Sequence, residues 1–202
     1  AMPIFGFTQS SYLKSIEKGK YSKLEKKIDK SLEKNPADIE LNYYKARLLM
    51  ESDYKNYNPK QSYKILVDLK SSYRKVDEKE RKKLEKIPLN ADVINRYIDT
   101  VCFRALNDAI KLDKEEGYQD YLNYYTLTPT KYLNSATENR NRVAFDNACK
   151  VNTPEVFQQF MTKYPKAAQY SSAKSKRNAL EFTRAKTTDN IESYKAFIAK
   201  YP

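Results

Sequence analysis

The chain has 202 residues, and its 38 Lys and Arg against 26 Asp and Glu give a formal net charge of +12. Because it contains no His, a Ser-His-Asp or Cys-His nucleophile pair, a histidine base and a histidine-ligated metal are excluded. Its three Gly lie far apart, which excludes a Gly-rich phosphate loop and disfavours a β-sandwich or barrel with many tight turns. No cofactor and no metal site are therefore predicted.

The N-terminal residues 1–75 have the pattern of helix pairs. Gly19-Lys-Tyr21 opens a segment with apolar residues at four-residue steps that ends at Asn35-Pro36, which predicts a helix stopped by the proline. A following helix is predicted from Asp38 to Met50. Its expected partner spans 61–73, with three side chains facing inward: Tyr63, Leu66 and Leu69. Residues 51–60 between them form a connection longer than a tight turn.

Residues 76–90 are dense in charge and predict a connector with one short solvated helix that ends at Pro88. The strongest helical pattern follows over 91–112, where apolar pairs recur every four residues. Such a step turns about 400° on an α-helix, so the stripe winds around it by about 40° per step. A helix of this kind is covered by more than one neighbour, as in stacked helical layers. The pairs are Val93-Ile94, Tyr97-Ile98, Val101-Cys102, Ala105-Leu106 and Ala109-Ile110.

Residues 148–165 align without a gap to residues 185–202, at an offset of 37. A third, partial copy lies 39 residues before the first, and it comprises Ala109, Asp113, Glu116, Tyr118, Tyr121, Leu122 and Tyr125. The alignment predicts three units over 91–202, each with a long helix of about 20 residues and a short one of about 11. Cys102 and Cys149 fall on these helices as small apolar residues, and two cysteines make no disulfide framework.

Each unit carries an acid or amide followed three residues later by Glu. This spacing predicts a capping box at the start of each short helix, with the first residue as N-cap and the Glu at N3. The predicted pairs are Asp113 with Glu116, Asn152 with Glu155 and Asp189 with Glu192. Lys-Tyr-Pro is expected to end the helix, because Pro cannot continue it.

The pattern from Gly19 to Tyr73 resembles the tetratricopeptide repeat, and with the later units the resemblance covers nearly all of residues 10–202. The whole pattern is similar to the tetratricopeptide-like modules of bacterial cell-envelope and secreted proteins. The resemblance implies an all-α, right-handed α-solenoid of about 10–11 helices, in stacked pairs. It also implies a non-catalytic protein–protein interaction scaffold that is periplasmic, outer-membrane-associated or secreted. The last unit is as apolar as an internal one, which predicts that the chain is a fragment of a longer protein.

Two surfaces are candidates for the unidentified protein or peptide partner. The expected exposed aromatic patch consists of Tyr43, Tyr44, Tyr54 and Tyr57, whereas most other tyrosines fall at packing positions. Lys23 and Lys27 belong to a lysine-rich stretch that is either a patch for an anionic polymer, such as nucleic acid or an envelope polymer, or a solvated helix face. Because Lys outnumbers Arg 18 to 3 in residues 1–90, specific nucleic-acid recognition is disfavoured. A spacer without a ligand remains a third alternative. No membrane span is predicted.

Overall fold

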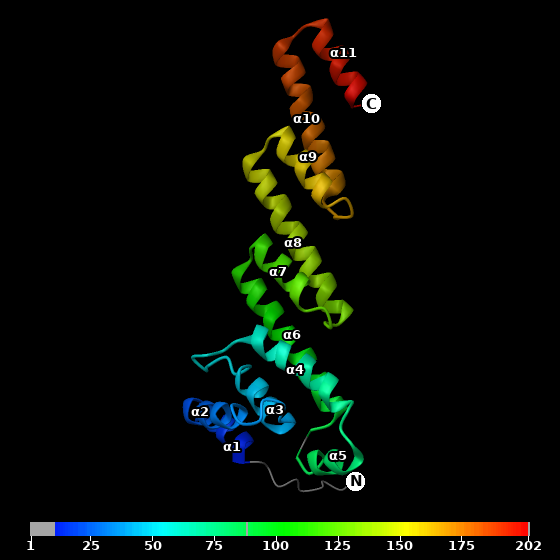
Figure 1. Cartoon of the computed structure of the whole chain (residues 1–202). Coiled ribbons are helices and arrows are strands. Elements are labelled where there is room, and N and C mark those ends of the chain that lie inside the picture. Colours follow the sequence, from blue (N-terminus) through cyan, green and yellow to red (C-terminus); the bar gives the residue numbers. More distant parts are fainter. Residues whose placement is uncertain (1–10, 88, 202) are drawn as a thin grey trace, which may run out of the picture. The chain divides into compact units, whose positions relative to one another are not determined.

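The computed structural model describes residues 11–87 and 89–201, so Pro88 and Pro202, predicted at helix ends, lie outside it. The described residues form eleven helices and no strand, which confirms the all-α class and the expected number of helices (Figure 1). The helices are α1 (Ser11–Glu17), α2 (Tyr21–Leu32), α3 (Ile39–Leu48), α4 (Pro59–Tyr73), α5 (Glu78–Leu84), α6 (Ala91–Leu112), α7 (Glu115–Tyr124), α8 (Thr130–Val151), α9 (Pro154–Lys163), α10 (Tyr170–Thr188) and α11 (Ile191–Lys200).

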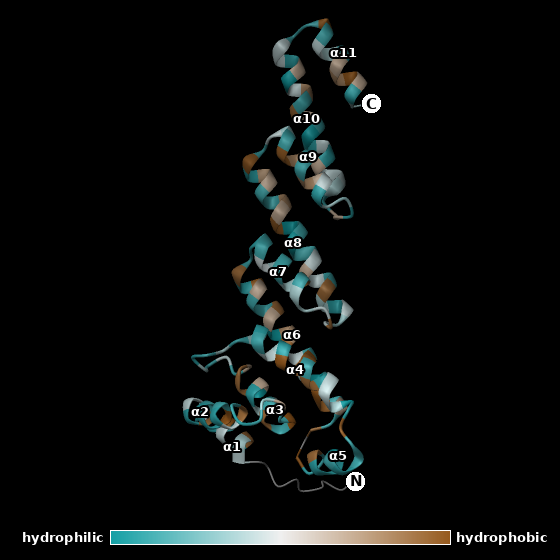
Figure 2. Ribbon diagram, viewed as in Figure 1, coloured by the Kyte–Doolittle hydropathy of each residue, from teal (hydrophilic) through white to brown (hydrophobic). Residues whose placement is uncertain are grey.

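The chain forms two compact units. Unit 1 comprises Ala1–Asp108 and Tyr124–Tyr132, and unit 2 comprises Ala109–Asn123 and Leu133–Pro202, so α6, α7 and α8 contribute residues to both. Hydrophobic and hydrophilic residues alternate along the helices (Figure 2). Among the described helices, none combines the length and the apolar character that crossing a membrane requires.

In unit 1, consecutive helices pack on one another, α2 on α3 and α3 on α4. The three side chains predicted to face inward from α4, at positions 63, 66 and 69, are buried. Asn58 caps α4 by accepting a hydrogen bond from the Gln61 amide at 3.0 Å, so this helix begins at Pro59, two residues before the predicted start. Pro at the first helical position costs no hydrogen bond, which explains the earlier start.

A cluster of charged side chains around the buried Lys45 joins α2 to α3. Lys45 is only 8% exposed, and its Nζ lies 2.9 Å from Glu25 Oε1 and 2.8 Å from Asp29 Oδ1. The hydroxyl of Tyr54 and the side-chain amide of Asn56 also donate to Glu25. Burial raises the pKa of Glu25, but hydrogen bonds from Tyr54, Lys45 and Asn56 outweigh it and hold the pKa below its ordinary value. The loop after α3 is thereby tied to α2.

The predicted helix over 91–112 is confirmed as α6, and its winding stripe is largely buried. Ile110 lies near its end and is exposed. Both cysteines are free, Cys102 being buried and Cys149 half-buried. The buried members of the stripe are Ile94, Ile98, Val101, Cys102, Ala105, Leu106 and Ala109.

In unit 2, α9 packs against α10, and α10 packs against α11. Small side chains of α8 and α10 allow a close approach, and the aromatic side chains of α9 fill the space between them. The buried cluster consists of Ala144, Ala148, Phe157, Phe160, Met161, Tyr164, Ala167 and Ala173.

The predicted capping boxes are wrong by one residue. Asp113, Asn152 and Asp189 have left-handed backbone conformations, with φ of 44°, 53° and 45°, and each donates its amide to the carbonyl four residues back. They therefore end the long helices. Thr153 and Asn190 are the N-caps, and their side chains accept from the amide three residues later at 3.4 and 2.8 Å. The sequence is ambiguous here because Asn and Asp both cap helix starts and tolerate the left-handed conformation.

The residue five positions after each left-handed residue is a tyrosine where that residue is Asp and a phenylalanine where it is Asn. The Tyr118 hydroxyl donates to Asp113 Oδ1 at 2.9 Å, and the Tyr194 hydroxyl donates to Asp189 Oδ1 at 3.0 Å. At the corresponding place after Asn152 stands Phe157, which has no hydroxyl to satisfy. A carboxylate is thus present where a phenol needs an acceptor.

Substitutions at Asn152 and Thr153, between α8 and α9, test whether Asn152 ends α8 and Thr153 caps α9. We expect Asn152→Thr to lower the free energy of unfolding by about 1–2 kcal/mol, because a β-branched residue is strained in the left-handed region. Thr153→Asn should stay within about 0.5 kcal/mol, because Asn is an equally good N-cap. Urea unfolding followed by circular dichroism measures both. A neutral Asn152→Thr variant would restore the capping-box prediction.

Candidate interaction site

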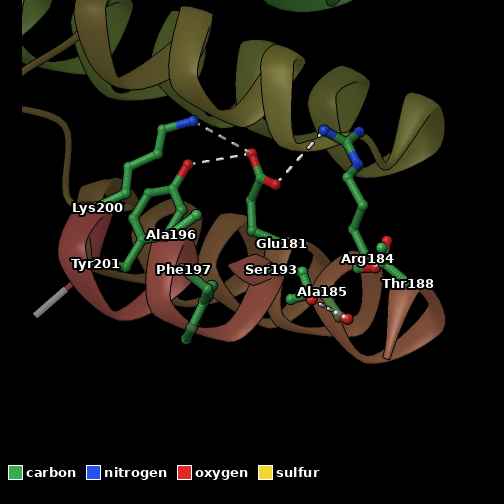
Figure 3. A pocket seen from close by; sticks show the side chains of 9 residues that line it. All are labelled: Glu181, Arg184, Ala185, Thr188, Ser193, Ala196, Phe197, Lys200 and Tyr201. Atoms are coloured by element: carbon green, nitrogen blue, oxygen red, sulfur yellow. Dashed lines mark hydrogen bonds and ion pairs between the residues drawn. The ribbon is translucent and has the colours of Figure 1, made fainter. Parts of the chain in front are cut away.

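Unit 2 contains at least three hollows, and two of them each lie between a long helix and the short helix that follows it. A third, of about 430 Å³, is lined by Pro154, Glu155, Gln158, Arg177, Glu181, Lys200 and Tyr201. The α8–α9 hollow has a volume of about 240 Å³, and the α10–α11 hollow, shown in Figure 3, has about 270 Å³. Every residue lining the second hollow stands 37 positions after a residue lining the first. The residues of the α10–α11 hollow are Glu181, Arg184, Ala185, Thr188, Ser193, Ala196, Phe197, Lys200 and Tyr201.

Both hollows combine an apolar lining with a polar rim. In each, a buried alanine of the long helix, Ala148 or Ala185, lines the space together with a phenylalanine of the short helix, Phe160 or Phe197. A side chain as small as alanine leaves room that a larger residue would occupy. A lysine and a tyrosine, adjacent in sequence, complete each lining.

At the α8–α9 hollow, the lysine and tyrosine share one carboxylate from α7. Lys163 Nζ lies 2.6 Å from Glu115 Oε1, and the Tyr164 hydroxyl donates to the same oxygen. Burial raises the pKa of Glu115, but the hydrogen bonds from Lys163 and Tyr164 outweigh it and hold the pKa below its usual value. Burial and the bond to Glu115 raise the pKa of Tyr164, so its phenol stays protonated at neutral pH.

At the α10–α11 hollow, the equivalent pair uses a carboxylate from a different position. Tyr201 donates to Glu181 Oε1 at 3.1 Å, and Lys200 Nζ lies 3.7 Å from the same oxygen, while Arg184 lies 3.5 Å from Oε2 (Figure 3). Glu181 is on α10 itself and replaces Ala144 of the α8–α9 hollow. The lysine and tyrosine are therefore held in both hollows, although the acceptor comes from α7 in one and α10 in the other.

An arginine beside each hollow connects three helices. The Arg177 guanidinium on α10 lies 4.6 Å from the centre of the ring of Tyr201, the residue directly after α11. One of its terminal nitrogens donates to the Gln158 side chain of α9, and two other nitrogens donate to Asn178 at 2.8 and 3.1 Å. A planar guanidinium suits this combination of ring stacking and directed hydrogen bonds.

The same contacts recur 37 residues earlier. Arg140 on α8 lies 4.6 Å from the ring of Tyr164, the residue directly after α9, and it donates to Gln119 of α7 at 2.9 Å and to Asn141. At the corresponding position of α6, 39 residues earlier still, stands the buried Val101. Sequence reasoning missed this pair of arginines, although the identical Arg-Asn dipeptides at 140 and 177 follow the same offset.

The predicted exposed tyrosine patch is wrong. Tyr43, Tyr44 and Tyr54 are 1%, 0% and 4% exposed, because their rings pack between helices of unit 1, Tyr43 lying 5.7 Å from the Tyr97 ring. Tyr57 is half-buried and donates to an α6 carboxylate at 2.7 Å. The apolar body of tyrosine favours burial wherever its hydroxyl finds an acceptor, and sequence spacing alone does not reveal that acceptor.

The two predicted lysines lie together. Lys23 and Lys27 are exposed on α2, and with Lys20 they line a hollow of about 300 Å³ between α1 and α2 in unit 1. Lys27 Nζ lies 4.6 Å from the centre of the Tyr12 ring, which lines the same space. The other lining residues are Ser11, Ser15 and Leu24, so the lining contains no carboxylate.

Asp77 and Glu78 act in helix capping and in an ion pair, and the Cys102 thiol is buried. Asp77 caps α5 by accepting from the Glu80 amide at 2.8 Å, and Glu78 pairs with Lys82. Burial raises the pKa of Cys102 to about 11, so this thiol is protonated at neutral pH. In the described parts of the chain, no three or more Cys, Asp or Glu side chains are grouped so as to hold a metal ion.

Comparison of the chain with protein-family models, with curated protein sequences and with solved structures finds no match.

The Arg177 contacts can be tested by substitution. We expect Arg177→Lys to lower the free energy of unfolding by about 1 kcal/mol, because an ammonium loses the planar stacking and the forked hydrogen bonds. Combined with Tyr201→Leu, it should be non-additive by about 0.5 kcal/mol or more. The control Lys176→Ala, at an exposed neighbouring position, should change stability by less than about 0.5 kcal/mol. Additive effects in urea unfolding would show that Arg177 and Tyr201 are not coupled.

Proposed function

We propose that this chain is a non-catalytic protein–protein interaction scaffold in which unit 2 binds an extended segment of a partner protein. In this proposal the helix pairs belong to a right-handed, tetratricopeptide-like α-solenoid in a bacterial periplasmic, outer-membrane-associated or secreted protein. The recurrence of nine lining positions in two hollows carries the proposal. A surface that repeats along a helical array presents equivalent subsites to successive parts of one elongated ligand.

The size and chemistry of the hollows favour a peptide over a small molecule. Small-molecule sites typically have volumes of roughly 300–1,000 Å³ and bury most of the ligand. The two recurring hollows, of about 240 and 270 Å³, are smaller and open, and only the neighbouring hollow of about 430 Å³ falls within that range. An apolar side chain of the partner fits against Ala185 and Phe197, because both are apolar and line the space. Lys200, at the rim, is more than half exposed and offers donors to a peptide carbonyl.

Filling the α10–α11 hollow tests this proposal. Ala196 lines the hollow and is exposed on α11, so Ala196→Trp adds bulk without disturbing a buried position. Peptides are first selected from a random displayed library against the intact chain, and their affinities are then measured by fluorescence anisotropy. We expect Ala196→Trp to weaken the selected peptides by about tenfold or more, since the added ring occupies the space of a peptide side chain.

Ala199→Trp is the matched control, because Ala199 is exposed on the same helix and does not line the hollow. It should leave the affinity within about twofold. Circular dichroism checks that both variants keep the wild-type helical content. If the library yields no binder, or if the two tryptophan variants weaken binding equally, the proposal fails.

A second candidate function is binding of an anionic polymer at the α1–α2 hollow. Three lysines with no carboxylate among the lining residues favour negatively charged ligands, and the net charge of +12 adds long-range attraction. The two serines at positions 11 and 15 supply hydroxyl groups for hydrogen bonds to phosphate oxygens.

Salt dependence tests this second candidate. Replacing Lys20, Lys23 and Lys27 together by Ala should weaken binding of a poly(U) oligonucleotide or of inorganic polyphosphate. It should also reduce the slope of log K against log salt by about two, because each lost phosphate contact removes about 0.7–0.9. The control replaces three exposed lysines around α5, at positions 79, 82 and 83. An equal effect of both triple variants would show that only net charge matters.

A further inference from the structure

The hollow of about 430 Å³ in unit 2 is lined by residues of α9 and α10 and of the end of α11, and it is called the three-helix hollow below. Its volume lies in the range of small-molecule sites, roughly 300–1,000 Å³. Most of its lining side chains are charged or carry hydrogen-bonding groups, which suits a polar ligand.

The equivalent place one unit earlier, among α7, α8 and α9, is filled by a carboxylate of the chain itself. Glu115, the first residue of α7, stands 39 positions before Pro154. Its Oε1 accepts from Lys163 Nζ at 2.6 Å and from the Tyr164 hydroxyl. Burial raises the pKa of Glu115, but these hydrogen bonds and the charges of Lys163 and Arg140 hold the pKa below its ordinary value. An arginine, a lysine and a tyrosine thus stabilise one ionised carboxylate.

The three-helix hollow keeps these three residue types but lacks that carboxylate. The arginine, lysine and tyrosine 37 positions later are Arg177, Lys200 and Tyr201, and all three line the hollow. Pro154 stands in the place of Glu115 and carries no acceptor in its side chain. The donors of a carboxylate site are therefore present around space that an internal carboxylate fills one unit earlier.

Glu181 serves Tyr201 more closely than it serves Lys200. The Tyr201 hydroxyl donates to Glu181 Oε1 at 3.1 Å, whereas Lys200 Nζ lies 3.7 Å from the same oxygen, beyond the usual range of a hydrogen bond (Figure 3). The corresponding lysine one unit earlier lies 2.6 Å from its carboxylate. Lys200 therefore has room for a closer acceptor.

The charges beside the three-helix hollow leave one cation in excess. Arg184 lies 3.0 Å from Glu155 and 3.5 Å from Glu181, so it engages both carboxylates of the lining. Arg177 and Lys200 are two further cations, and three cations thus face two carboxylates. The equivalent positions one unit earlier carry two acidic and two basic residues. A ligand with a single negative charge would restore that balance.

Arg177 retains donors for such a ligand. Its guanidinium donates through Nε and one terminal nitrogen to Asn178 and through the other terminal nitrogen to Gln158. These contacts occupy three of the five N–H groups of a guanidinium. The two that remain suit a carboxylate oxygen, since hydrogen bonds between ionised groups are among the strongest in proteins.

Helices that follow in the array leave this kind of position open. The side chain of Lys163, the counterpart of Lys200, is 64% exposed although α10 and α11 come after it. Its ion pair within the described residues is with Glu115 of α7, a helix that precedes it. The three-helix hollow is likewise made by three helices that are all present, and its counterpart shows that further helices do not fill it.

From these contacts we infer that the three-helix hollow binds the carboxylate of a small organic monoacid or of a peptide C-terminus, in the place that Glu115 fills one unit earlier. Lys200 donates to one carboxylate oxygen and Arg177 to the other, and the rest of the ligand lies beside Pro154. The inference goes beyond the proposed function, which concerns the side chains of an extended segment in the two recurring hollows.

Titration with propionate tests this inference on the intact 202-residue chain. Propionate carries a carboxylate on a short apolar chain, and propionamide is its neutral counterpart. NMR of the nitrogen-15-labelled protein at constant ionic strength follows the Arg177 Nε–H signal, which is assigned through its loss in Arg177→Lys. We expect propionate to shift this signal saturably, with a dissociation constant of roughly 1–10 mM. Propionamide should bind about fivefold or more weakly, because it carries no charge.

Returning a carboxylate to position 154 supplies the decisive variant. Pro154→Glu should weaken propionate binding by about tenfold or more, because the tethered carboxylate occupies the same place at a high effective concentration. Pro154→Ala is the matched control, which removes the proline without adding an acid, and it should bind within about twofold of the wild type. Lys200→Gln should weaken binding by about fivefold or more. Circular dichroism checks that each variant keeps the wild-type helical content.

Net charge is controlled with the triple variant of the α1–α2 hollow. Replacing Lys20, Lys23 and Lys27 by Ala removes three positive charges, whereas Pro154→Glu changes the charge by only one. The triple variant should nevertheless bind propionate within about twofold of the wild type. The inference is wrong if propionate and propionamide bind equally, if Pro154→Glu binds like the wild type, or if the triple variant loses binding as strongly as Pro154→Glu does.

Two further ligands distinguish the sources of the carboxylate. Acetyl-dialanine with a free C-terminus is compared with its C-terminal amide in the same titration. An affinity of the free acid about fivefold or more above that of propionate assigns the hollow to a peptide C-terminus, and a smaller gain assigns it to a small acid. Equal binding of the free acid and the amide would overturn the inference.

The experiment also separates this inference from the proposed function. Ala196 lines the α10–α11 hollow and does not line the three-helix hollow, so Ala196→Trp should leave propionate binding within about twofold. Loss of propionate binding alongside intact binding of library peptides rejects only the inference. Intact propionate binding without any library binder rejects only the proposed function.

Discussion

A buried tyrosine gains stability from its ring only if its hydroxyl keeps a hydrogen-bond partner, and much of this structure follows from that requirement. The chain has 18 Tyr and no Trp, so it fills helix interfaces with side chains that each carry one polar group. Carboxylates repeatedly supply the acceptor, as Asp113 does for Tyr118 and Glu115 for Tyr164. These acids therefore stabilise helix ends and helix contacts, and they are already engaged by hydrogen-bond donors.

In the α8–α9 and α10–α11 hollows, the tyrosine hydroxyl finds its acceptor on different helices, Glu115 of α7 and Glu181 of α10. Pro154 stands where Glu115 stands one unit earlier, so the acceptor for the second lysine and tyrosine cannot come from that position. Glu181 supplies it from α10, at a site that is Ala144 in the first hollow. The carboxylate that supports the rim changes position, whereas the adjacent lysine and tyrosine of the rim and the alanine and phenylalanine of the lining are the same in both hollows.

The two faces of each short helix in unit 2 have different surroundings. Both α9 and α11 contribute one face to a hollow shared with the preceding long helix. The opposite face of α9 is covered by α10, whereas that of α11 is exposed through Ile191 and Ile198. Arg177 of α10 contacts Gln158 of α9 and the ring of Tyr201, which directly follows α11 and lines the α10–α11 hollow.

Sequence periodicity alone determined the all-α class, the helix over 91–112, the inward side of α4 and the alignment at an offset of 37. These features depend on local geometry, since residues three or four apart share a helical face. Only the tertiary structure decided which tyrosines are buried. The hydroxyl of a buried tyrosine needs an acceptor, and for Tyr54 that acceptor is Glu25, 29 residues away in the sequence. The tertiary structure likewise brought Glu181 within 3.7 Å of Lys200 Nζ and ended the long helices at Asp113, Asn152 and Asp189. Asn and Asp satisfy either local geometry, so the packing of the next helix determines which one they adopt.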